Sequence, residues 1–219
     1  MSRLYPLLVD LTGRRCLVIG GGRVAERKAV HLLECDALVE VIAPTVTPHL
    51  DALAGEGRIR CRCRPATPDD VPGAFLVFVA TDDPAVNRVL AQSAQQSGAL
   101  VNVADDPGTC TFIVPSVFRR GDLTVAVSTA GGSPALAKRL RERLEATIGP
   151  EYEAFLSALR ELREAAHAQI PDTAERQAVY REALESDLFA VAARGDREAV
   201  AARIAALIAR APGFQRRES

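Results

Sequence analysis

The chain has 219 residues, of which 48% are hydrophobic, enough for one large domain or two small ones with a buried core. Its 27 Lys and Arg against 28 Asp and Glu leave a net charge of -1, which excludes a general attraction to nucleic acid or to an anionic membrane. No apolar run is long enough to span a bilayer, and the N-terminus lacks the pattern of a secretory signal. We therefore expect a soluble, cytoplasmic protein.

Cysteine and histidine usage points away from a metal site. The five cysteines are odd in number and scattered, and the nearest pair, Cys61 and Cys63, has no second pair to complete a zinc site. The histidines His31, His49 and His167 are far apart in the chain. We expect reduced thiols and no bound metal.

Short apolar strands alternate with amphipathic helices over the first half of the chain, which is typical of a parallel α/β sheet. Strands are expected at residues 16–19, 38–43, 59–64, 75–80 and 100–103. Helices are expected at 24–34, after the N-cap Thr47, and at 84–97, where Gly98 ends the helix.

The pattern changes after residue 110. The stretch TFIVPSVFRRGDLTVAVST predicts a β-hairpin whose two strands are joined by residues 119–122. A helix follows from Ser133 or Pro134 to Ile148. Residues 151–210 show apolar spacings of three and four. They predict a small all-helical domain, punctuated by Pro171 and Gly195 and followed by a frayed tail at 213–219.

A phosphate-binding turn is the first functional signal. Gly20, Gly22 and Ala25 form a G-x-G-x-x-A pattern directly after the first strand and at the start of a helix. Gly20 permits the tight turn, Gly22 lets the backbone approach a pyrophosphate, and Ala25 allows the helix to pack closely on the strand. A plain strand-to-helix turn is the alternative. The loops at 43–45 and 80–83 favour the nucleotide site, because they also follow strand ends.

The residues alone leave the choice between NAD and NADP open. The acidic residue that usually binds the adenosine ribose at the end of the second strand is missing, because Glu40 lies inside that strand. Arg23 is able to bind either a 2′-phosphate or the pyrophosphate.

Beyond this turn, the chain resembles the precorrin-2 dehydrogenase family, whose members stand alone or form the N-terminal module of siroheme synthases. The resemblance covers residues 1 to about 150 and rests on the segments YPLLVDLTGRRCLVIGGGRVAERKA, ATDDPAVN, VNVADDPGTCTFIVPS and VAVSTAGGSPALAKRLRERLE. It implies a homodimer with an NAD-binding Rossmann domain at 1–113, a dimerisation region at 114–149 and a helical C-terminal domain at 150–219. It also implies NAD-dependent oxidation of precorrin-2, a polycarboxylated tetrapyrrole, to sirohydrochlorin.

Asp105 matches the family's catalytic aspartate. A carboxylate just after the fifth strand faces the cofactor crevice, where it is placed to take a proton as the hydride leaves. The alternative is that Asp105 and Asp106 only form a turn before Pro107. The expected cofactor contacts are Gly20, Gly22, Arg23, Val24, Pro44, Thr45, Thr81, Asp82, Asn102 and Val103.

A polyanionic substrate requires cations and backbone donors. The expected substrate contacts are Ser128, Gly132, Ser133, Lys138, Arg119 and Arg120, and a solvated basic face is the alternative interpretation of these cations. Where the family can carry a phosphoserine, its V-S-S segment reads V-S-T here, with Thr129 at the second place. We therefore do not carry phosphorylation over to this chain.

Three functional alternatives stay open. Some members of the family also insert ferrous iron into sirohydrochlorin, and these residues are compatible with both activities. The chain could instead be an NAD(P)-dependent oxidoreductase of another substrate. The third alternative is a sensor module like those that gate potassium transport, which would bind the dinucleotide without turnover. The hairpin and the G-G-S-P helix argue against the sensor, because such modules normally end after the sheet.

Overall fold

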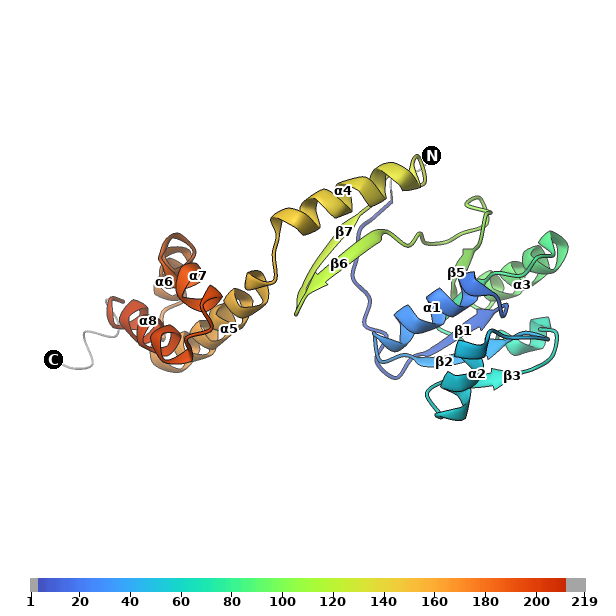
Figure 1. The fold of residues 1–219 in the computed structure, drawn as a ribbon, viewed down its shortest axis with the longest axis horizontal. Helices are drawn as coiled ribbons and strands as arrows, with labels where there is room; N and C mark the ends of the chain where they lie inside the picture. Colours follow the sequence, from blue (N-terminus) through green and yellow to red (C-terminus); the bar gives the residue numbers. More distant parts are fainter. Residues whose placement is uncertain (1–3, 212–219) are drawn as a thin grey trace. The chain divides into compact units, whose positions relative to one another are not determined.

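The computed structural model describes residues 4–211 and divides into two compact units, which meet in the chain at Val114 and Pro115 (Figure 1). The frayed tail expected at 213–219 lies outside the described residues. The finer division into domains at 1–113, 114–149 and 150–219 stays a prediction.

The first unit is built on a five-stranded parallel sheet with strand order β3-β2-β1-β4-β5. This order confirms the predicted Rossmann-type α/β fold, with a topological switch point between β1 and β4. The strands are β1 (Arg15–Ile19), β2 (Leu38–Ile42), β3 (Arg60–Arg62), β4 (Leu76–Val79) and β5 (Leu100–Val103).

Both faces of the sheet are covered, which is why its central strands are almost continuously apolar. Cys16 and Val18 of β1 contribute to the core under α1 (Arg23–Leu33) and α2 (Pro48–Gly55). Leu17 and Ile19 point to the opposite face, whose core includes side chains of α3 (Pro84–Gln96). Thr47 caps α2 through a 3.3 Å bond from the Leu50 amide, as predicted.

Strand β3 is shorter than the predicted 59–64. The chain turns sharply after Arg62, because the Arg64 amide bonds to the Arg62 carbonyl at 2.9 Å and the Arg64 side chain binds Asp70. A short edge strand of arginines also resists pairing with other chains. The connection to β4 contains a short 3₁₀ helix, η1 (Pro68–Asp70), which the hydrophobic pattern does not predict.

Two buried carboxylates, each paired with arginines, hold this edge of the sheet. Glu40, only 3% exposed, forms ion pairs with Arg15 at 2.9 Å and with Arg62 at 2.6 Å. The Arg64 guanidinium, followed by hydrogen bonds from Thr67, lowers the pKa of the Asp70 carboxyl, although burial opposes the shift. Removing an arginine would leave a buried carboxylate without part of its counter-charge, so the pairs tie β1, β2, β3 and η1 together.

The second unit begins with an antiparallel hairpin of β6 (Ser116–Arg120) and β7 (Leu123–Val127). The prediction that Arg119 and Arg120 belong to the connecting turn is wrong, because only Gly121 and Asp122 join the strands. A two-residue turn requires a residue that accepts a positive φ, and Gly121 takes φ +54°. The arginines are therefore strand residues, with Arg120 opposite Leu123.

Helices complete the second unit. Helix α4 (Pro134–Thr147) packs against both strands of the hairpin and begins at Pro134, as predicted, with Ser133 as its N-cap. The remaining helices enclose a separate core that includes Leu162 and Leu207, with Pro171 and Gly195 in the connections where they were expected. Within residues 4–211 no helix combines the length and apolar composition of a membrane span. These remaining helices are α5 (Glu151–Gln169), α6 (Thr173–Glu185), α7 (Leu188–Ala193) and α8 (Arg197–Ala209).

Candidate functional site

The glycine turn between β1 and α1 has the geometry expected of a phosphate-binding turn. Gly20 takes φ +125°, and a Cβ at this position would overlap the Ala80 carbonyl. Gly22 is the N-cap of α1, and a Cβ there would meet no atom within 4 Å. Ala25 is fully buried in the core between α1 and the sheet. The turn therefore leaves open space at Gly22, at the positive end of the helix dipole.

Gly21 is a structural element of the site that the motif did not predict. A Cβ on Gly21 would overlap the Thr45 carbonyl, and the Gly21 carbonyl accepts a 3.0 Å hydrogen bond from the Thr47 amide. The glycine turn and the loop after β2 are thus held in close contact. The run of three glycines was the available signal, since only two of them belong to the motif.

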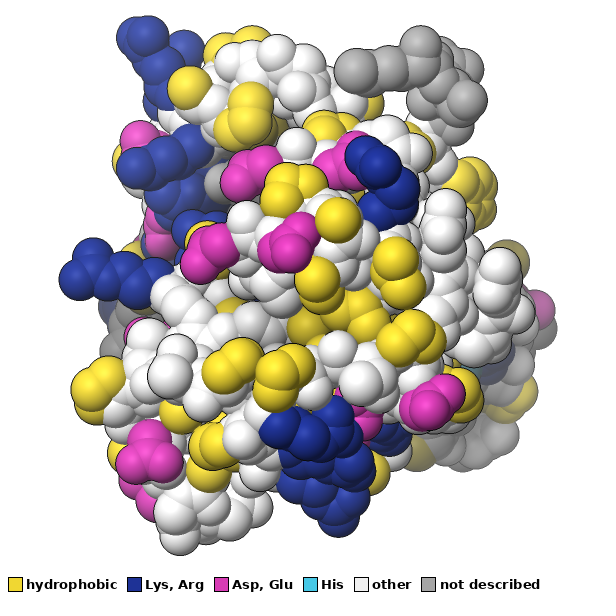
Figure 2. Space-filling view, turned by 90° about the vertical axis from the view of Figure 1, so that its right-hand side faces the viewer, with side chains coloured by type: hydrophobic (Ala, Val, Ile, Leu, Met, Phe, Trp, Pro, Cys, Tyr) yellow, Lys and Arg dark blue, Asp and Glu magenta, His cyan; other side chains and the backbone are white. Residues whose placement is uncertain are grey.

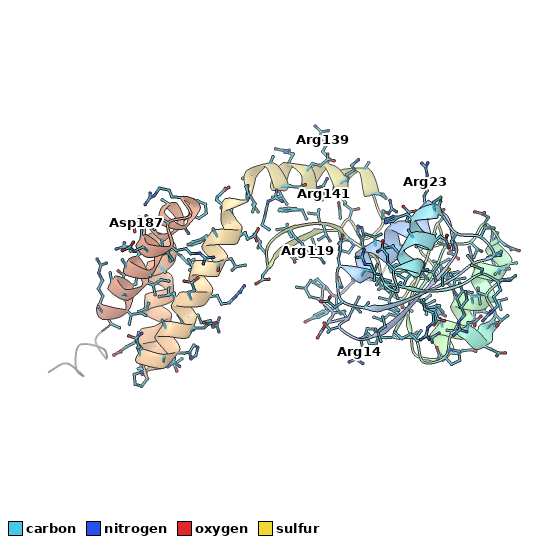
Figure 3. The ribbon with its side chains drawn as sticks, turned by 60° about the horizontal axis from the view of Figure 1, so that its bottom comes forward. Arg14, Arg23, Arg119, Arg139, Arg141 and Asp187 are labelled. Carbon is cyan, nitrogen blue, oxygen red and sulfur yellow. The ribbon has the colours of Figure 1, made fainter. Side chains whose placement is uncertain are left out.

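The first turn of α1 presents one cation and one paired carboxylate. Arg23 and Val24 are exposed, and the Arg23 side chain extends away from the ribbon (Figure 3). Glu26 accepts from the Thr47 hydroxyl and lies 3.4 Å from His49, and the Thr47 bond is the main cause of the lowered pKa of Glu26. Glu26 is thus engaged by Thr47 and His49, whereas Arg23, directly after the glycine turn, is an exposed cation.

The loops after β2 and β4 lie at the same edge of the sheet as the turn, the edge where parallel strands present their carboxyl ends. Pro44 and Thr45 are exposed there, as is Asp82. The Thr81 hydroxyl lies 2.6 Å from the Asn87 side chain, which anchors this loop to α3. Glu40 is buried in ion pairs, so it does not supply the missing ribose carboxylate.

An apolar cavity of about 280 Å³ lies between the segment after β3 and the first turns of α3. Hydrophobic side chains gather at the centre of the face of the first unit shown in Figure 2. Walls of this kind suit a flat apolar ring better than a charged group. The lining residues are Ala66, Pro68, Ala85, Val86, Val89 and Leu90.

The two aspartates after β5 have different surroundings. Asp106 accepts a 2.6 Å hydrogen bond from the Thr109 hydroxyl and so serves the turn. Asp105 is exposed with φ +61°, a left-handed conformation that is uncommon outside glycine. Among residues 4–211 no side-chain hydrogen bond or ion pair engages its carboxylate. The turn role therefore belongs to Asp106, and Asp105 keeps a carboxylate available for chemistry.

The Asp105 loop is joined to neighbouring strands at both ends. The Ala104 amide donates to the Val79 carbonyl of β4 at 2.8 Å, while the Val103 amide donates to the Cys110 sulfur at 3.2 Å. Asn102 donates to the Phe112 carbonyl at 3.1 Å, so this predicted cofactor residue also holds the loop. The sequence analysis treated Cys110 only as a reduced thiol and did not predict its contact with β5.

The predicted substrate residues all belong to the second unit, whereas the predicted cofactor residues belong to the first. Ser128, Gly132 and Ser133 belong to one turn before α4, in which the Gly132 amide bonds to the Thr129 carbonyl at 2.9 Å. The Ser133 hydroxyl caps the Leu136 amide at 3.2 Å.

The predicted cations of the second unit differ in their surroundings. Lys138 lies 3.9 Å from Glu142, and Arg120 lies 3.5 Å from Glu145. Their charges are partly neutralised within the protein. Arg119 is exposed on β6, and Arg139 projects outward from α4 (Figure 3).

The parallel sheet, its switch point and the glycine turn at the start of α1 define a dinucleotide-binding Rossmann domain. Comparison with known families agrees with this class. A family described as putative NAD(P)-binding matches residues 7–116, and one described as sirohaem biosynthesis protein central matches residues 120–147.

The chain belongs to this putative NAD(P)-binding family, and the relatives that it matches include siroheme synthases. It is 38% identical over 194 residues to a siroheme synthase of Methylobacillus flagellatus and 39% identical over 199 residues to one of Gluconacetobacter diazotrophicus. In each case 89% of this chain is matched, and the match covers 42% of the relative's length. The chain thus spans about two fifths of these relatives.

A solved structure resembles nearly the whole chain. It is described as SirC, precorrin-2 dehydrogenase, and is 29% identical, with a TM-score of 0.77. The match covers 90% of this chain and 98% of SirC. The similarity therefore extends across both units and is not confined to the nucleotide-binding fold.

Proposed function

We propose that this protein is an NAD-dependent precorrin-2 dehydrogenase that produces sirohydrochlorin in siroheme biosynthesis. The similarity to SirC over 98% of that chain supports precorrin-2 as the substrate, and the glycine turn supports NAD as the cofactor. The observation that carries the chemistry is Asp105, an exposed carboxylate in a left-handed backbone conformation at the end of β5. Such conformations are kept at functional sites at a cost of about 1–3 kcal/mol.

The residues at the carboxyl edge fit NAD. The free space at Gly22 and the first amides of α1 suit the pyrophosphate, and Arg23 supplies a cation. Thr45 at the end of β2 offers a hydroxyl to the adenosine ribose, and the apolar cavity beside α3 suits the adenine ring. The remaining proposed contacts are Val24, Pro44, Thr81, Asp82, Asn102 and Val103.

In the proposed reaction precorrin-2 loses one hydride and one proton. Bound NAD supplies the hydride acceptor. Asp105 accepts the proton from the tetrapyrrole, because its carboxylate is exposed and is not committed to the turn that Asp106 forms. The backbone bonds of Ala104 and Val103 fix the loop, so that the base is oriented before the substrate binds.

The test is anaerobic incubation of the purified protein with precorrin-2 and NAD, with sirohydrochlorin absorbance and NADH followed together. We expect equal amounts of both products. Asp105→Asn should lower kcat at least about 100-fold, the usual contribution of a general base, while the dissociation constant of NAD stays unchanged. Asp106→Asn is the matched control and should stay active, because an amide oxygen still accepts from Thr109. NAD binding without turnover by the unaltered protein would instead support the sensor function.

The same assay tests iron insertion. Ferrous ion is added after sirohydrochlorin has formed, and the spectrum of siroheme is followed with and without the enzyme. An enzyme-dependent increase in its rate would add a chelatase activity, and equal rates would restrict the protein to dehydrogenation.

We also propose that the second unit binds carboxylates of the tetrapyrrole. The turn that holds Ser128, Gly132 and Ser133 offers hydroxyls and the N-terminal amides of α4. Arg119, Arg120 and Lys138 supply cations for these carboxylates. Arg119→Ala should raise KM for precorrin-2 about tenfold with kcat retained, because the lost interaction exists before and during the reaction. An unchanged KM would remove Arg119 from the substrate site.

The active form is proposed to be a cytoplasmic homodimer. A two-stranded hairpin is marginal by itself, and one face of helix α4 leaves Leu136, Leu140 and Leu144 between 37% and 49% exposed. Burying this stripe against a second copy would remove apolar surface from water. The free thiols of the five cysteines are consistent with a reducing compartment.

A further inference from the structure

Cys110 closes the loop that carries Asp105. Its sulfur accepts the Val103 amide at 3.2 Å and lies 3.5 Å from the Val103 carbonyl. It also lies 3.3 Å from the Asp106 carbonyl, within reach of a thiol donor. One side chain therefore contacts the last residue of β5 and the residue directly after Asp105.

These contacts span the strained residue. Asp105 has φ +61°, and its chain neighbours are Ala104, bonded to β4, and Asp106, whose carbonyl faces the thiol. A left-handed aspartate persists only where the surrounding structure holds it. The thiol supplies one of these restraints without touching the carboxylate itself.

The adjacent residues do not duplicate this role. Thr109 bonds to the Asp106 side chain at 2.6 Å, and Thr111 bonds to the Val101 amide at 2.7 Å. The Thr111 contact ties the end of the loop to β5 and the Thr109 side chain holds the Asp106 carboxylate, whereas the Cys110 thiol faces backbone groups on both sides of Asp105. Cys110 is also only partly buried, so packing does not fully account for a thiol here.

We propose that Cys110 is a positioning residue for the proposed proton transfer: its thiol holds the 103–106 backbone so that the Asp105 carboxylate is aimed at the substrate. The inference rests on the proposed function, because it gives Cys110 a role only through Asp105. A cysteine suits the position because its side chain accepts from one backbone amide and can donate to a carbonyl.

The test is a double-mutant cycle on the full chain, with Cys110→Ala, Asp105→Asn and the double variant assayed with precorrin-2 and NAD. Cys110→Ala should lower kcat about tenfold, the effect of losing one oriented hydrogen bond, without changing the dissociation constant of NAD. In the Asp105→Asn background the same change should have almost no further effect, because the two residues act in one step. Cys110→Ser should restore most of the kcat, because a hydroxyl also accepts and donates.

Cys63→Ala is the matched control for loss of a thiol, since Cys63 is exposed and lies outside the loop. It should keep full kcat. Equal kcat for Cys110→Ala and the unaltered protein, with Asp105→Asn inactive, would overturn the positioning role alone. Full activity of Asp105→Asn would overturn the proposed base instead. Two outcomes would show that Cys110 only stabilises the fold. One is that the effects of the two substitutions on kcat are additive, and the other is that Cys110→Ser has a kcat as low as that of Cys110→Ala.

Discussion

At the scale of single residues, three consecutive glycines at the end of β1 have three different physical roles. Gly20 adopts a backbone angle that other residues disfavour. Gly21 has no room for a side chain because the Thr45 carbonyl packs on it, whereas Gly22 faces open space. Only the last of these roles concerns a ligand directly, so the three positions should respond differently to substitution.

Gly21→Ala should lower the free energy of unfolding by about 1–3 kcal/mol, because the added methyl group forces the loop after β2 to move. Gly22→Ala should leave the stability of the free protein within about 0.5 kcal/mol and weaken NAD binding, because its Cβ enters the space proposed for the pyrophosphate. Urea unfolding and NAD titration separate the two effects. Unchanged NAD affinity in both Gly22→Ala and the bulkier Gly22→Asp would mean that the phosphate site lies elsewhere.

At the scale of elements, the edge formed by β3 and η1 is held by charge as well as by apolar packing. Glu40 and Asp70 are both buried, and arginines of β1, β3 and the following loop neutralise them. The segment between β3 and β4 has only the three-residue helix η1 as regular structure. The ion pairs connect this segment to the sheet. Stability at this edge should therefore depend on pH.

Asp70→Asn should lower the free energy of unfolding by about 2 kcal/mol at pH 7, because charge-assisted bonds from Arg64 are lost. The folded pKa of Asp70 is lowered, so its contribution is complete above the ordinary aspartate pKa of about 3.9 and decreases as the pH falls below it. The free energies of unfolding of Asp70→Asn and of the unaltered protein should therefore become more similar as the pH falls from about 5 to 2. Thermal unfolding across this range measures the difference, with exposed Asp69→Asn as the control. A constant difference would assign the loss to packing.

At the scale of the whole molecule, the chain combines a dinucleotide-binding unit with a second unit that has its own core. The comparisons match the same two parts, with one family over 7–116 and another over 120–147. The proposed catalytic residue lies in the first unit and the proposed substrate cations in the second. Dimerisation is proposed to depend on the second unit, where α4 carries its exposed leucines.

Leu140→Asp should convert the proposed dimer to a monomer, because it places a charge in the apolar stripe of α4. The mass measured by light scattering during size-exclusion chromatography should fall by half at micromolar protein concentration. Leu184→Asp is the matched control, since this leucine is 62% exposed on a different helix, and the dimer should persist. If the unaltered protein already has the mass of a monomer, the homodimer proposal fails.

Elements whose causes are local can be derived from the sequence alone. Strand and helix order, the Thr47 cap and the tight turn at Gly20 follow from hydrophobic period and side-chain chemistry, and the structure agrees with them. The turn at Gly121 and Asp122 is also local, but the placement of Arg119 and Arg120 within β6 depends on strand register, which pairing with β7 decides.

Which polar groups contact one another depends on the three-dimensional fold. Glu40 with Arg62, Gly21 with the Thr45 carbonyl and Cys110 with the Val103 amide bring together residues from different segments of the fold. The sequence left open whether Asp105 is a catalytic base or, like Asp106, only a turn residue before Pro107. The structure separates them, because the Thr109 hydroxyl occupies Asp106 while the backbone bonds around Asp105 leave its carboxylate exposed. Such contacts depend on the path of the chain in space, which local periodicity does not encode.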